Sequence, residues 1–90
     1  MKKSLVSIII PAYNASPLIM ETITSILNQT YAPIEIIVVD DGSKDNTQAL
    51  LRPMIESRKL KYFYQENSGQ AMARLKGFRE SHGDFVSFID

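Results

Sequence analysis

Hydrophobic and polar positions along the chain follow two different periods, which predict alternating strands and helices. Short apolar runs rich in β-branched or aromatic residues predict four strands, over residues 5–10, 34–39, 60–65 and 85–89. Between these runs, apolar residues recur three and four positions apart, as expected for three amphipathic helices. The predicted order is therefore β-α-β-α-β-α-β, with no internal repeat and no low-complexity segment.

Capping and turn residues mark the start of the first two helices. Ser16 followed by Pro17 suits an N-cap and the first helical position of one helix. Asp45, with Gln48 three residues later, resembles a capping box at the start of the next helix. Pro53 lies too deep in that second helix for its first turn, so we expect a kink or a break there.

The third helix follows a polar turn over residues 66–69. Apolar residues at helical spacing predict the face that it buries against the sheet, and Gly83 is predicted to be its C-cap. The predicted buried stripe consists of Ala71, Met72, Leu75, Phe78 and His82.

Helical crossovers of this length imply parallel strands joined by right-handed connections. The third run mixes polar and aromatic residues, which is typical of an edge strand, and this gives the strand order 3-2-1-4. The predicted fold class is therefore α/β, a Rossmann-like three-layer arrangement of a four-stranded parallel sheet and three helices. Ligands bind such sheets beyond the carboxyl ends of the strands, where the winding direction reverses, here between the first and fourth strands.

Composition and charge narrow the function classes. Ten Lys and Arg balance ten Asp and Glu, which argues against a nucleic-acid partner and against a polybasic membrane anchor. No apolar run approaches the ~18 residues of a membrane span, and no signal peptide is expected. The absence of Cys excludes a disulfide scaffold and a Cys nucleophile, and the single His82 excludes a multi-histidine metal centre. These features favour a globular protein of the cytoplasm.

Polar segments follow the predicted strand ends and converge on one rim of the sheet. They are residues 11–14, 40–43, 67–70 and Asp90. Neighbouring side chains on a strand point to opposite faces, so the carboxylates of Asp40 and Asp41 cannot easily share one task. One could accept hydrogen bonds from a nucleobase or a sugar while the other orders the Gly42–Ser43 turn; equally, both could be turn and capping acids.

Other rim residues have a functional and a purely structural interpretation. Tyr13 offers a flat face for stacking on a base, or it packs over the end of the sheet. Ser68 and Gly69 start a helix and could present free N–H groups to a pyrophosphate. Arg74 could reach a phosphate, or it is a solvated helix residue. Asp90 could ligate a divalent cation, although one carboxylate alone makes a poor site.

Several motifs in the same order resemble one family over essentially the whole chain, the family 2 glycosyltransferases of the GT-A fold. The motifs are Val6–Asn14, Ser25–Tyr31, Glu35–Ser43, Gln65–Ala71, Ala73–Arg74 and Gly83–Asp90. The resemblance implies transfer of a sugar from a nucleotide-diphosphate sugar to an acceptor hydroxyl, with a divalent metal, Mn²⁺ or Mg²⁺, held through a D-x-D motif. One departure is Leu75, where the family usually has Asn.

The resemblance also implies roles for individual residues. A nucleobase would be lined by Pro11, Ala12 and Tyr13 and read by Asp41. The ribose and phosphates would lie near Ser68, Gly69 and Arg74. Asp90 is similar to the first Asp of the D-x-D motif and would bind donor and metal. The nucleotide-sugar-binding set is therefore Pro11, Ala12, Tyr13, Asp41, Ser68, Gly69, Arg74 and Asp90.

The resemblance also implies that several functional elements of the family lie beyond residue 90. The second Asp of the D-x-D motif would be residue 92, and the catalytic base and acceptor elements would follow it. We therefore expect residues 1–90 to be the N-terminal nucleotide-binding part of a truncated GT-A domain, without a catalytic residue and inactive alone. The complete enzyme is expected to be inverting, to use a glycan or lipid-linked glycan acceptor in cell-surface polysaccharide biosynthesis, and to work in the cytoplasm or at the cytoplasmic face of the membrane.

Two other classes of protein remain as alternatives. The chain could be a non-catalytic nucleotide-binding or self-assembling module, because the fourth strand would form an exposed apolar edge that favours self-association. It could also be a phosphoacceptor receiver domain. That class needs its acidic pair after the first strand and an acceptor Asp after the third, whereas here the third strand ends in Gln65 and Glu66.

Overall fold

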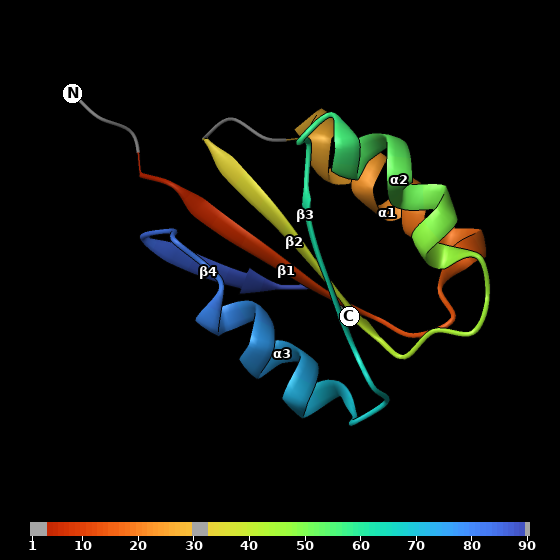
Figure 1. Cartoon of the computed structure of the whole chain (residues 1–90). Helices are drawn as coiled ribbons and strands as arrows, with labels where there is room; N and C mark the ends of the chain where they lie inside the picture. The colour runs from red at the N-terminus through yellow and green to blue at the C-terminus, as the bar shows by residue number, and fades with distance from the viewer. Residues whose placement is uncertain (1–3, 30–32, 90) are drawn as a thin grey trace.

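The computed structural model describes residues 4–29 and 33–89, in which strands and helices alternate as predicted (Figure 1). The elements are β1 (Val6–Ala12), α1 (Ser16–Gln29), β2 (Ile34–Asp41), α2 (Thr47–Glu56), β3 (Lys61–Gln65), α3 (Gln70–Arg79) and β4 (Phe85–Phe88). β1 and β2 both run two residues further than predicted, so that Ala12 and Asp41 belong to the strands.

All strand pairs in the sheet are parallel, and the order is β3-β2-β1-β4, which confirms the predicted topology. β3 and β4 form the two edges, and β1 and β2 lie between them. The chain therefore reverses its winding direction between β1 and β4, the place that the sequence indicates for a ligand site.

The helices cover the sheet unequally. α1 and α2 lie together on one face, and α3 alone lies on the other (Figure 1). The larger core joins α1 and α2 to the sheet through Ile10, Ile23, Val38 and Leu51, among others. The smaller core joins α3 to the sheet and contains Ile9, Ile37, Val39 and Ala73. Both faces of β2 are therefore buried, which explains its run of six buried residues.

Two helix starts differ from their predictions. α1 already includes Ser16, because the carbonyl of Ala15 accepts the N–H groups of the first turn, so Ser16 is not the N-cap. α2 begins at Thr47 after the cap residue Asn46, which makes no side-chain capping bond. The predicted capping box is wrong. Asp45 lies one residue outside the cap, where its carboxylate accepts the N–H of Thr47 at 3.0 Å.

Of the kink or break predicted at Pro53, the break is wrong, because α2 continues through this residue from Thr47 to Glu56. A proline inside a helix removes one backbone hydrogen bond. Here the apolar stripe of α2 packs against the larger core, with Leu51 fully buried and Met54 and Ile55 partly buried beside it. This tertiary packing holds the helical path that local propensity disfavours.

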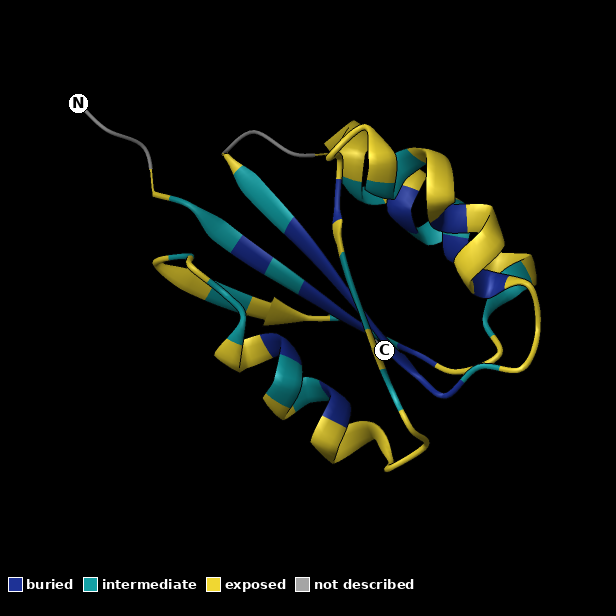
Figure 2. Ribbon diagram, viewed as in Figure 1, coloured by how far each residue is buried: buried dark blue, intermediate teal, exposed yellow. Residues whose placement is uncertain are grey.

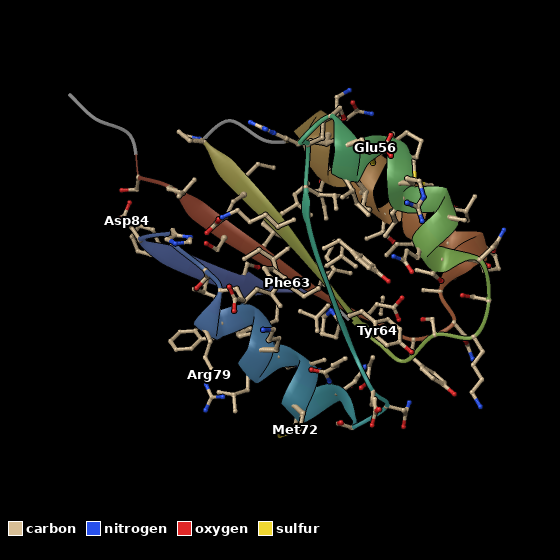
Figure 3. The ribbon with its side chains drawn as sticks, viewed as in Figure 1. Glu56, Phe63, Tyr64, Met72, Arg79 and Asp84 are labelled. Atoms are coloured by element: carbon tan, nitrogen blue, oxygen red, sulfur yellow. The ribbon has the colours of Figure 1, made fainter. Side chains whose placement is uncertain are left out.

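α3 buries a different face from the one predicted. Ala73 and Gly77 are its buried residues, whereas the predicted stripe members Met72 and Phe78 are exposed. A Cβ on Gly77 would lie 2.4 Å from Cγ2 of Ile9, so α3 approaches β1 closely only because this position lacks a side chain. Figure 3 shows Met72 and Arg79 on the side of α3 away from the sheet.

Gly83 is not the C-cap of α3, because the helix ends at Arg79 with Glu80 as its cap. Instead the N–H of Gly83 donates to Oγ of Ser7 on β1 at 2.8 Å. A Cβ on Gly83 would lie 2.5 Å from the same oxygen. The glycine therefore serves a close approach between the α3–β4 connection and the sheet.

A carboxylate at the amino end of β2 organises that approach. Glu35 accepts hydrogen bonds from the hydroxyl of Ser7 and from the N–H of His82, and it forms an ion pair with Nζ of Lys61 at 3.0 Å. Ser7 and Glu35 are direct neighbours in the β1–β2 register. The cluster thus ties three strands and the α3–β4 connection together at one point.

We expect this cluster to stabilise the fold above acidic pH. Burial alone would raise the pKa of Glu35, but the hydrogen bonds from Ser7, His82 and Lys61 outweigh it and hold the pKa at about 2, against 4.5 ordinarily. Because the folded-state pKa is the lower one, the stabilisation is full above about pH 4.5 and is lost as pH falls towards 2. Glu35→Gln should lower the free energy of unfolding by about 2 kcal/mol at pH 7 and by much less near pH 2.

Urea unfolding of both proteins across this pH range measures the effect. Glu21→Gln, at an exposed position of α1, is the matched control and should change little. A loss of stability in Glu35→Gln that does not depend on pH would contradict the account.

Candidate functional site

An open cavity of about 430 Å³ lies at the carboxyl ends of β1 and β2, beside the start of α3. Its lining residues are Pro11, Ala12, Tyr13, Ala15, Asp41, Asn67, Gly69, Gln70 and Ala73. The cavity therefore lies at the predicted rim, and five residues of the predicted binding set line it. Asn67 and Gln70 belong to the predicted rim but not to the predicted binding set. Ala73 belongs to one of the family motifs but has no predicted site role, and Ala15, which is small and apolar, has no sequence signal.

Asp41 is the acid that faces this cavity. It ends β2 and is almost fully buried. Its Oδ1 accepts hydrogen bonds from Nε2 of Gln65 at 2.9 Å and from the N–H of Ser68 at 2.7 Å. Its Oδ2 accepts one from the N–H of Gly69 at 2.9 Å. Asn67 completes the contact by donating from Nδ2 to the backbone carbonyl of Asp41 at 3.1 Å.

These bonds keep Asp41 ionised. Burial alone would raise its pKa, but the hydrogen bonds from Gln65, Ser68 and Gly69 prevail and lower the pKa below its usual value. A carboxylate oxygen has two lone pairs, so Oδ2 can accept a second bond besides that from Gly69. The cavity therefore contains a fixed, negatively charged acceptor.

The expectation that Ser68 and Gly69 offer free N–H groups is wrong, because both N–H groups donate to Asp41. Gly69 still lines the cavity with its backbone, at a φ of 98° that disfavours other residues. Ser68 does not line it, and its hydroxyl donates to the carbonyl of Glu66 at 2.7 Å. Local sequence could not reveal that a carboxylate from another strand takes both donors.

Asp40 has the other role that the sequence left open. It is 1% exposed, and its Oδ1 accepts the N–H of Ser43 at 2.8 Å, which orders the turn after β2. Its Oδ2 accepts the hydroxyl of Tyr62 from β3 at 2.5 Å. Asp40 and Asp41 thus point to opposite faces as predicted, and each holds a different loop.

The remaining predicted site residues are placed as follows. Tyr13 is 51% exposed at the cavity wall, which leaves its ring available for stacking. Arg74 lies one turn into α3, outside the lining, and its Nη2 donates to Oε1 of Gln70 at 3.3 Å. Asp90 lies outside the described residues, so its predicted contacts with donor and metal are not described.

The described residues do not by themselves form a metal site. Within residues 4–29 and 33–89, no group of three or more His, Asp or Glu side chains could hold an ion. Asp41 is the acidic residue among those lining the cavity, and its oxygens already accept N–H donors. In the same residues, no helix is both long and apolar enough to cross a bilayer.

Comparison with known proteins identifies relatives of this chain. The sequence model of one protein family, Glycosyl transferase family 2, matches residues 7–90. A Bacillus subtilis glycosyltransferase, TuaG, whose name places it in teichuronic acid biosynthesis, is 41% identical over 90 residues. That alignment covers 98% of this chain and 36% of TuaG.

Solved structures show the same arrangement. Staphylococcus aureus TarS in complex with UDP superposes with a TM-score of 0.83 at 32% identity, over 100% of this chain and 27% of that one. The mannosyltransferase PcManGT of Pyrobaculum calidifontis, solved with GDP-Man and Mn²⁺, superposes with a TM-score of 0.82 at 32% identity, over 96% and 26%. The chain thus has the fold of part of these glycosyltransferases, the GT-A fold, and spans well under two thirds of each.

Proposed function

This chain belongs to glycosyl transferase family 2, and we propose that it supplies the donor-nucleotide site of an enzyme that transfers a sugar from a nucleotide-diphosphate sugar to an acceptor hydroxyl. The single observation that carries the proposal is the ionised Asp41 carboxylate, held rigidly in a cavity beside an exposed tyrosine. The solved relatives bound to UDP and GDP-Man support it.

The cavity has the two features that a nucleobase needs. Oδ2 of Asp41 can accept an N–H from the base edge, and the ring of Tyr13 can stack on its face. Pro11 and Ala12 supply apolar lining. We propose that the ribose and phosphates lie near Ser68, Gly69 and Arg74. Because Gly69 has no side chain, it would let the ligand come close to the backbone.

The proposal for the complete enzyme extends further. Residues 1–90 would be the N-terminal nucleotide-binding part of its glycosyltransferase domain, and the chain spans 36% of the length of TuaG. A divalent cation is proposed because PcManGT was solved with Mn²⁺, and Asp90 is the residue of this chain that would contribute to it. We further propose an inverting reaction on a glycan or lipid-linked acceptor, in the cytoplasm or at the cytoplasmic membrane face. The name of TuaG, which refers to teichuronic acid biosynthesis, supports a role in cell-surface polysaccharide biosynthesis.

The nucleotide site is tested by isothermal titration of the chain with UDP, with and without Mn²⁺. Asp41→Asn removes the charge from the acceptor and should weaken UDP binding by at least about tenfold, because hydrogen bonds to charged groups contribute about 1.5–3 kcal/mol. Tyr13→Ala, at an exposed position, should also weaken binding while leaving the thermal midpoint unchanged. Asp84→Asn, at the opposite end of the sheet (Figure 3), is the control that should bind normally. No heat at millimolar UDP in either arm would contradict the proposal.

We expect the isolated chain to show no sugar transfer and no donor hydrolysis. The reason is that Asp41, the acid lining the cavity, is a weak proton acceptor, because the hydrogen bonds from Gln65, Ser68 and Gly69 lower its pKa. Release of UDP from UDP-sugars, measured by a coupled assay against buffer, checks this. Turnover clearly above the buffer rate would overturn the expectation.

We also propose that the chain self-associates through the β4 edge. Among the strands that the structure describes, β4 pairs with β1 alone, and its residues Phe85 and Phe88 are 62% and 44% exposed. Figure 2 shows exposed residues on β4 and also on α3. An open strand edge can pair with the same edge of a second copy by two-fold symmetry.

Light scattering at high concentration measures this association. Phe85→Lys should lower the average mass towards that of a monomer, because a charged edge opposes strand pairing. Tyr64→Lys, on the opposite edge strand β3, is the matched control and should leave the mass unchanged. A strictly monomeric mass for the unmodified chain would remove the support for a self-assembling module.

A further inference from the structure

Two loops at the cavity rim are joined by reciprocal hydrogen bonds. The N–H of Asn14, in the β1–α1 loop, donates to Oγ of Ser43 in the β2–α2 loop at 2.8 Å. In return, the N–H of Lys44 donates to Oδ1 of Asn14 at 2.8 Å. A third bond runs from the N–H of Ser16 to Oδ2 of Asp45 at 3.1 Å. These three hydrogen bonds form a latch that joins Asn14 and the first residue of α1 to the β2–α2 loop.

The latch holds Asn14 in an uncommon conformation. Its φ is 49°, in the left-handed region that residues other than glycine seldom adopt and in which Asn is more frequent than most. The hydrogen bond that Asn14 donates to Ser43 and the one that it accepts from Lys44 stabilise this geometry. Tyr13 immediately precedes Asn14 and lines the cavity, so a shift of the backbone at Asn14 would also move the tyrosine.

Ser43 is itself held from deeper in the protein. Its N–H donates to Oδ1 of Asp40, and the hydroxyl of Tyr62 donates to Oδ2 of that carboxylate. Asp40 is buried, and none of Asp40, Ser43 and Tyr62 lines the cavity. A continuous chain of contacts therefore runs from β3 through Asp40 and Ser43 to Asn14 and the tyrosine beside it.

We propose that Ser43 is a positioning residue for nucleotide binding, acting through Asn14 on Tyr13 without touching the ligand. This inference rests on the proposed nucleotide site, because it states that the hydrogen bonds between the two loops affect the affinity of that site for its ligand. It differs from a general stabilising role in one respect, since the effect of Ser43 on binding should depend on the presence of the Tyr13 side chain.

Affinity for UDP in the unmodified chain and in Ser43 variants tests the proposal. Ser43→Ala removes the acceptor for Asn14 and should weaken UDP binding by about threefold to tenfold. Ser43→Thr keeps a hydroxyl and should restore most of the affinity. Ser57→Ala, whose hydroxyl only contacts the carbonyl of Met54 at the far end of α2, is the matched control and should bind normally.

A double-mutant cycle separates positioning from general stabilisation. In a Tyr13→Ala background, adding Ser43→Ala should change UDP affinity by less than about twofold, because the side chain through which Ser43 acts is gone. An undiminished loss in that background would overturn the proposal. Unchanged affinity on Ser43→Ala alone, in a chain that binds UDP, would overturn it as well.

Amide hydrogen exchange measured by NMR keeps this test separate from that of the nucleotide site. Ser43→Ala should accelerate exchange at the N–H of Asn14 and leave that of Ser57 unchanged, whether or not UDP binds. If the unmodified chain binds no UDP, the proposed function fails, and the affinity role assigned to Ser43 fails with it even when exchange at Asn14 accelerates. If UDP binds but Ser43→Ala leaves exchange at Asn14 unchanged, Ser43 does not act on Tyr13 through Asn14. In that case only the positioning proposal is overturned.

Discussion

Two carboxylates at opposite ends of β2 fix where α3 lies on the sheet. Asp41, at the carboxyl end, accepts the N–H groups of the two residues that precede α3. Glu35, at the amino end, accepts the N–H of His82 in the connection that follows the helix. Residues 35, 37, 39 and 41 alternate onto the same face, so these acids flank the apolar pair Ile37 and Val39, which packs against α3. The two acids thereby fix the position of α3 along the sheet.

The cavity follows from this placement. Because Gly77 lacks a Cβ, α3 lies close to Ile9, and its first turn reaches the rim beside the end of β1. The other face of β2 carries Asp40, which orders the turn towards α2 and, through Ser43, the loop bearing Tyr13. The adjacent acids thus hold loops on two sides of the cavity, and of the two only Asp41 lines it. A site of this kind gains its rigidity from partners outside it.

Much of the architecture was predictable from local pattern. The strand order and the polar third strand at one edge follow from periodicity and crossover length, and the rim follows from the strand order. The buried face of α3 did not follow, because apolar periodicity weights large residues, whereas close packing here selected Ala73 and Gly77 and left Phe78 exposed. Pro53 misled for a related reason, since packing of α2 on the core overrode the local preference for a break.

By itself the sequence determined the alternating elements, their parallel order, the rim that carries the cavity and the family to which the chain belongs, because these depend on patterns within short segments. Only the tertiary structure decided which donor each carboxylate accepts. Asp41 accepts a hydrogen bond from Gln65, which lies 24 positions away in the sequence. The hydroxyl of Ser7 likewise accepts the N–H of Gly83, which lies 76 positions away. Such partners come together only when the sheet assembles, so no local pattern shows that the N–H groups of Ser68 and Gly69 are already taken.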